Sequence, residues 1–79
     1  MPTIVIVDDE REILEPLEKM LLDESFSVRA FINPLRALEY LKLHPVELVI
    51  FDIKMPELDG LSLLHRVRAY QPQIPAIFL

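Results

Sequence analysis

Hydrophobic residues along this chain alternate between two spacings, which predicts strands that alternate with helices. A continuous β-branched run at residues 3–7 and the segment at residues 46–51, which ends in Leu48-Val49-Ile50-Phe51, are typical of strands buried on both faces of a sheet. Residues 26–32 alternate apolar and polar side chains, as a half-exposed or edge strand does. The apolar run at residues 74–79 predicts a last strand.

Helices are predicted between these strands. The first spans residues 11–24, and we expect Pro16 to kink it or to leave its first turn irregular. The second begins at Asn33-Pro34, because asparagine suits the N-cap and proline the first helical position, and it ends before Pro45. Asp59 caps the third. The apolar residues expected on the buried faces are Ile13, Leu17, Met20 and Leu21, then Leu35, Leu38 and Leu41, then Leu61, Leu64 and Val67.

The order of these elements predicts an α/β fold. Strands that alternate with helices require a parallel sheet with right-handed crossovers and helices on its faces. We expect one domain spanning residues 1–79, without repeats or a linker. The chain is 52% hydrophobic, which favours a globular core, but its 79 residues include no cysteine. Packing or association must therefore hold it together.

Charge and hydropathy exclude several classes of partner. The formal net charge is −5 and the pI is about 4.8, which argues against direct contact with nucleic acid or an anionic membrane surface. The first apolar run is too short for a signal peptide or a membrane span, and Asp8-Asp9-Glu10 follows it at once. A cytoplasmic location is the expectation.

Acidic residues follow two of the apolar strands. Asp8 and Asp9 come directly after the first, and Asp52 comes directly after the third. Ligand sites of parallel α/β sheets lie at the carboxyl ends of the strands, so these carboxylates are expected to converge. Clustered carboxylates repel one another, and a hard cation such as Mg²⁺ would relieve that repulsion. An aspartate in such a site is also a competent nucleophile toward phosphorus.

A simpler explanation of the first acidic run is open. Asp8, Asp9 and Glu10 precede a helix and could merely cap it and complement its dipole. Asp52 is harder to explain in that way, since it follows a buried strand and leads into Lys54-Met55-Pro56. The two acidic features together favour a site.

Two strings of residues resemble the acidic signatures of two-component receiver domains. They are Val5 to Glu10 and Val49 to Gly60, and Ile74 to Leu79 resembles the fourth strand of that family. The resemblance implies a flavodoxin-like, doubly wound parallel sheet with strand order 2-1-3-4, lacking the usual final helix-strand-helix. It implies a signalling module that accepts a phosphoryl group and is not an enzyme in the ordinary sense.

The resemblance also assigns roles. Asp52 matches the phosphoacceptor, Asp9 a direct Mg²⁺ ligand, and Asp8 a carboxylate that acts on the metal largely through water. Lys54 matches the position whose backbone carbonyl completes the metal shell. Met55-Pro56 and Asp59-Gly60 match residues that shape the loop. The phosphoryl donor implied is a histidine kinase or phosphotransfer protein.

The family pattern extends past Leu79. Receiver domains place a serine or threonine just after the fourth strand and a lysine after a fifth, and neither is in this sequence. We therefore expect slow phosphorylation and impaired signalling. The alternative is a structural or self-associating half-fold without phosphotransfer. Activity as an aspartyl phosphohydrolase is a weaker alternative, because Lys54 occupies the position where such enzymes usually have a second acid.

Association is the last expectation. With strand order 2-1-3-4 the apolar residues 74–79 form a free sheet edge, a template for pairing with a second chain. We expect a homo-oligomer that buries this edge and a sheet face carrying Val49 and Phe51. Leu14 and Leu22 lie off the predicted face of the first helix and could contact a partner. Surface positions are expected for His44 and His65 and for the pair Arg66 and Arg68.

Overall fold

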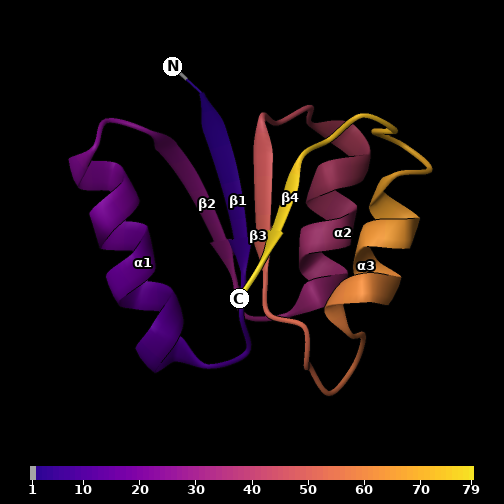
Figure 1. Cartoon of the computed structure of the whole chain (residues 1–79), viewed down its shortest axis with the longest axis horizontal. Coiled ribbons are helices and arrows are strands. Elements are labelled where there is room, and N and C mark those ends of the chain that lie inside the picture. The colour runs from indigo at the N-terminus through magenta and orange to yellow at the C-terminus, as the bar shows by residue number, and fades with distance from the viewer. Residues whose placement is uncertain (1) are drawn as a thin grey trace.

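A computed structural model describes residues 2–79 and shows a four-stranded sheet between helices (Figure 1). The strands are β1 (Thr3–Val7), β2 (Ser27–Phe31), β3 (Leu48–Phe51) and β4 (Ala76–Phe78), and the helices are α1 (Arg11–Asp23), α2 (Pro34–Leu43) and α3 (Gly60–Val67). Every predicted element is present in the predicted order. In this part of the chain, no helix is long and apolar enough to cross a bilayer.

The sheet is parallel throughout, with the strand order β2-β1-β3-β4. Helix α1 covers one face, and α2 and α3 lie side by side on the other (Figure 1). The flavodoxin-like order expected from the resemblance is therefore confirmed. It places the two strands that end in acid, β1 and β3, next to each other in the centre.

The larger hydrophobic core lies between the sheet and the α2–α3 pair. Val5, Val7, Val49 and Phe51 point to this side and are at most 1% exposed. The helical residues buried against them are Ala37, Leu38, Leu41, Leu63 and Val67. Val49 and Phe51 thus do not line an uncovered face, and the expectation that they would is wrong.

Four residues that were predicted on the buried faces of helices are exposed instead: Leu61, Leu35, Ile13 and Met20. Leu61 is 62% exposed, whereas Leu63 and Val67 form the buried stripe of α3, with Leu64 partly buried. In α2, Leu38 and Leu41 are buried as predicted, but Leu35 is exposed and Ala37 takes its place. In α1 the buried residue is Leu14, not Ile13.

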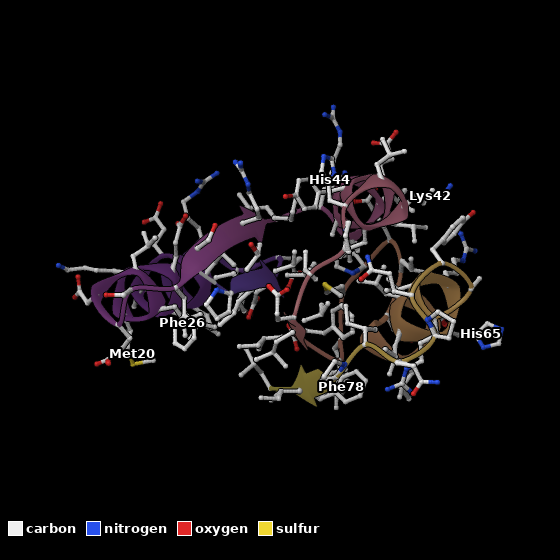
Figure 2. The ribbon with its side chains drawn as sticks, turned by 90° about the horizontal axis from the view of Figure 1, so that it is seen from above. Met20, Phe26, Lys42, His44, His65 and Phe78 are labelled. Atoms are coloured by element: carbon white, nitrogen blue, oxygen red, sulfur yellow. The ribbon has the colours of Figure 1, made fainter. Side chains whose placement is uncertain are left out.

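The smaller core lies between the sheet and α1. Ile4, Ile6 and Ile50 meet Leu14 there, with Leu17 and Leu21 partly buried beside them. Met20 is 56% exposed, contrary to its predicted place in the core, and projects from α1 (Figure 2). Leu14 is therefore unavailable to a partner, while Leu22 is exposed as expected.

The helices cover the two edge strands of the sheet, β2 and β4, to different extents. In β4, Ile77 is 49% exposed on the face that carries α1, because α1 packs over β1 and β2 and contacts β4 little. Within residues 2–79, β4 is an edge strand of the sheet, as predicted, and association through it stays a prediction. β2 is the opposite edge, as its alternating pattern indicated.

Local chemistry fixes where the helices begin and end. Asn33 Oδ1 accepts the Leu35 amide at 2.8 Å and caps α2, as predicted. Helix α1 runs through Pro16 from Arg11 to Asp23, so the first turn is regular helix. Two residues after the end of the helix, Ser25 takes the left-handed conformation with φ of 70°, and the Phe26 amide donates to the Leu21 carbonyl.

Candidate functional site: an acidic cluster

Strand register brings the acidic residues together. Val7 of β1 is paired with Phe51 of β3, so the residues that follow them, Asp8 and Asp52, leave the sheet side by side. Backbone hydrogen bonds continue past the strand ends: the Asp52 amide donates to the Val7 carbonyl at 2.9 Å. The Asp8 amide donates to the Phe31 carbonyl of β2 at 3.1 Å. These hydrogen bonds between strands hold the backbone of both Asp8 and Asp52 in place.

The side chains of Asp8, Asp9 and Asp52 converge as predicted. Each offers a carboxylate oxygen, and these oxygens lie within 4.8 Å of one another. Asp8 is 2% exposed, whereas Asp9 and Asp52 are half-buried and reachable from solvent. The cluster is thus open on one side and closed beneath Asp8, which suits a small ligand that keeps part of its water shell.

Burial raises the pKa of Asp8 above its ordinary value of 3.8. The Glu10 amide opposes this by donating to Asp8 Oδ1 at 2.9 Å, while the negative charges of Asp52, Asp9 and Glu12 add to the rise in pKa. Two effects therefore disfavour the ionised form, desolvation and like-charge repulsion. A cation placed among these oxygens would counter both.

The capping explanation for the first acidic run does not fit. The N-cap residue of α1 is Glu10, and its side chain makes no capping hydrogen bond. Asp8 instead accepts a hydrogen bond from Glu10 in the turn before the helix. These acids are held in a turn that faces Asp52.

The loop after β3 is folded back under Asp52. The Lys54 amide donates to Asp52 Oδ1 at 3.3 Å, so the backbone of Lys54 lies beside the cluster. The Gly60 amide donates to the Ile53 carbonyl at 2.8 Å. A Cβ at Gly60 would lie 2.6 Å from the Asp52 carbonyl oxygen, so only glycine allows this approach.

Asp59 closes the loop by capping α3, as predicted. Its Oδ1 accepts the Ser62 amide at 2.8 Å, and the Ser62 amide and hydroxyl lower the pKa of Asp59. The carboxylate is exposed and turned to the helix end, so its role is structural. One contributor was not foreseen from the sequence: Glu12, in the first turn of α1, adds its charge to the field on Asp8.

The other singled-out residues lie away from the cluster. His44 and His65 are exposed as expected (Figure 2). His44 stacks on Tyr40 with ring centroids 4.1 Å apart. Arg66 is exposed, but Arg68 is more than a solvated charge, since it donates to the Ile74 carbonyl at 3.1 Å and ties α3 to the next loop.

Comparison with known proteins places this geometry in a family. The sequence profile of the response regulator receiver domain matches residues 4–79. Response regulator GtcR of Aneurinibacillus migulanus is 42% identical over 77 residues, covering 98% of this chain and 31% of the relative. Regulatory protein VanRc of Enterococcus gallinarum is 37% identical over 65 residues, covering 82% of this chain and 28% of the relative.

Solved structures agree. The CheY-like receiver domain protein of Methanospirillum hungatei JF-1 superposes with a TM-score of 0.94 at 28% identity, covering 99% of this chain and 62% of that one. A chain in the complex of histidine kinase ThkA with response regulator protein TrrA gives a TM-score of 0.90 at 32% identity, covering 99% and 67%.

The chain spans less than a third of these two curated relatives. Within that span, the central strand pair ending in acid, the three convergent carboxylates and the profile match agree with one another. This chain belongs to the response regulator receiver domain family.

Proposed function

We propose that this chain is a phosphoacceptor: it takes a phosphoryl group onto Asp52 from the phosphohistidine of a histidine kinase or phosphotransfer protein. The observation that carries the proposal is the meeting of Asp8, Asp9 and Asp52 at the carboxyl ends of β1 and β3. Asp52 is half-buried, so an incoming phosphorus atom can reach it. The kinase relation rests on the family and on the ThkA–TrrA complex.

The residues of this chain divide the work. Asp52 Oδ1 is held by the Lys54 amide, which leaves Oδ2 as the attacking oxygen. The new O–P bond forms as the donor's N–P bond breaks, and the donor imidazole leaves with the bonding electron pair. The backbone of Asp52 is held by the hydrogen bond that its amide donates to the Val7 carbonyl, so the carboxylate is positioned before the donor arrives.

We propose Mg²⁺ as the cofactor, because its preferred ligands are oxygens of this kind. Asp9 and Asp52 would bind it directly, Asp8 largely through water, and the Lys54 carbonyl would complete the shell. When bound, the ion supplies positive charge to the phosphoryl oxygens. Asp8 suits the indirect role, since it is the most buried of the three and its pKa is raised by that burial.

Phosphorylation is tested by treating the chain with phosphoramidate and Mg²⁺ and following the mass. We expect a single phosphoryl addition that disappears in Asp52→Asn and persists in Asp23→Asn, a matched change at an exposed aspartate of α1. Labelling that survives Asp52→Asn would refute the assignment. The expectation that labelling is slow stays a prediction, and the rate of mass increase in the same experiment tests it.

Metal binding is tested separately by titrating Mg²⁺ into the unphosphorylated chain. Asp9→Ala should lower the affinity at least tenfold, about 1.4 kcal/mol, while Asp23→Ala should leave it unchanged. Equal affinity in both variants would remove Asp9 from the ligand set.

We propose self-association through β4 as a second property of the 79-residue chain. Support comes from the free edge at Ala76–Phe78 and from Ile77 and Leu79, which are 49% and 54% exposed. Light scattering after gel filtration should give a dimer or larger species, and Ile77→Lys should reduce it. Leu61→Lys changes a comparably exposed leucine on α3 and should not. A wild-type monomer at every concentration would refute the proposal.

A further inference from the structure

A groove lies between the last turns of α2 and α3, at the end of the molecule opposite the acidic cluster. Its volume is about 290 Å³, and its lining is Leu38, Lys42, His65, Arg66, Ala69 and Tyr70. Because α2 and α3 run antiparallel to the strands that they cover, their C-terminal ends lie away from the carboxyl ends of β1 and β3. The groove is therefore separate from the phosphorylation site proposed above.

The charge of this groove is opposite to that of the whole chain. The sequence has 13 acidic and 8 basic residues, yet the lining carries two cations and a histidine and no carboxylate. Within residues 2–79, neither Lys42 nor Arg66 forms an ion pair, although carboxylates are abundant elsewhere. Lys42 and His65 lie on the outer side of the helix pair, where a partner can reach them (Figure 2).

The groove also has apolar surface. Leu38 lies at its floor and is 7% exposed, while Tyr70 stands at its rim and is 52% exposed. The Lys42 ammonium lies 5.5 Å from the centre of the Tyr70 ring, so the cation and the aromatic face are presented together. Basic residues in a last turn also complement the helix dipole. That effect accounts for one cation on each helix, but it does not account for an exposed tyrosine between them.

A single side chain holds the two walls of the groove in place. Gln71 donates through Nε2 to the Leu41 carbonyl at 2.7 Å and to the His44 carbonyl at 2.9 Å. Its Oε1 accepts the Val46 amide at 3.2 Å. The segment that follows α3 is thus hydrogen-bonded to the end of α2 and to the residues just after it. The groove therefore needs little ordering when a ligand enters, which favours binding.

We infer that this groove docks an acidic segment of a partner protein, with one apolar side chain on Leu38 and Tyr70 and flanking carboxylates on Lys42 and Arg66. Charge complementarity favours this occupant, because the groove concentrates cations and offers room for about one large side chain. The docking surface lies away from Asp52, so a partner can occupy it without covering the phosphoacceptor.

The probe is a fluorescein-labelled peptide with a Leu-Phe pair flanked on each side by glutamates. Anisotropy should show saturable binding to the full chain. Reversing both cations in Lys42→Glu/Arg66→Glu should weaken it about tenfold or more. The control, Lys19→Glu/Arg36→Glu, has the same net charge but changes exposed residues outside the groove, and it should weaken binding less than about twofold.

Binding site and partner class are checked in parallel. Backbone amide shifts on the wild-type chain should change at Lys42, Ala69 and Tyr70 and not on α1, which locates the bound peptide even if the double variant unfolds. A peptide with serine in place of Leu-Phe should bind more weakly. The inference is overturned by an absence of saturable binding, by equal losses in both double variants, or by tighter binding of a single-stranded RNA oligomer at the same residues.

Discussion

Replacing Gly60 by alanine should destabilise the fold and disturb the backbone of Asp52. The added Cβ would lie 2.6 Å from the Asp52 carbonyl oxygen, 3.1 Å from Ile53 Cα and 3.2 Å from Phe78 Cε1. Two of these atoms belong to the backbone and cannot turn aside. Overpacking of this kind costs about 1–3 kcal/mol. The gain from alanine over glycine in a helix is only about 0.5–1 kcal/mol.

Because the closest contact is with a backbone oxygen, the overpacking cost should lie in the upper half of its range, about 2–3 kcal/mol. The net loss expected for Gly60→Ala is therefore about 1–2.5 kcal/mol, a large share of the roughly 4–12 kcal/mol typical of a domain of this size. Urea denaturation followed by circular dichroism measures it, and the melting temperature should fall by roughly 4–8 °C per kcal/mol. Leu61→Ala is the control, since Leu61 is the next residue and is 62% exposed. It should change stability by less than about 0.5 kcal/mol. A Gly60→Ala variant as stable as the wild type would refute the steric argument.

Three further changes test other features. Leu63→Ala should lower the free energy of unfolding by about 2–5 kcal/mol, because Leu63 is fully buried, whereas Leu61→Ala should leave it almost unchanged. Equal losses in urea denaturation would contradict the buried face assigned to α3. Ser25→Gly should raise the free energy of unfolding by about 1 kcal/mol, since Ser25 holds a φ of 70°, and an unchanged urea midpoint would show that serine is unstrained there. Without Mg²⁺, the wild type should lose stability relative to Asp8→Asn as the pH rises above 3.8. The reason is that folding raises the pKa of Asp8, so ionisation of Asp8 disfavours the folded state. Urea midpoints of the two proteins, measured from acid to neutral pH, would contradict this if the difference between them did not grow with pH.

The sequence was sufficient to predict the elements and the acidic cluster. β1 and β3 are continuous apolar runs, a pattern of central parallel strands, and acidic residues follow both directly. Two such strands are expected to be neighbours at the centre of the sheet, so their carboxyl ends were predicted to lie side by side. The pairing of Val7 with Phe51, which the sequence does not reveal, then sets Asp8 next to Asp52.

Which side a residue faces was harder to predict. Helix α1 has apolar residues at neighbouring positions, so Ile13 and Leu14 each begin a stripe of helical spacing. Only packing against the sheet decides between them, and it buries Leu14. In β3 every residue is apolar, so alternation carries no information on the face to which Phe51 points. The steric role of Gly60 also depends on a tertiary approach that the sequence does not reveal.

The backbone at Asp52 and the loop that follows it differ in how firmly they are held. The Asp52 amide donates a hydrogen bond across the sheet to the Val7 carbonyl. The Leu79 amide donates one to the carbonyl of Phe51, the residue just before Asp52. The turn from residue 54 to residue 59 has only peripheral bonds, at Lys54 and at the cap of α3. Amide hydrogens should accordingly exchange slowly at Asp52 and orders of magnitude faster across residues 56–58, since exchange follows the free energy of local opening. A phosphoryl group on Asp52 would thus be attached to a firmly held main chain. Its first effect would be on residues 56–58, the neighbouring segment that opens most easily.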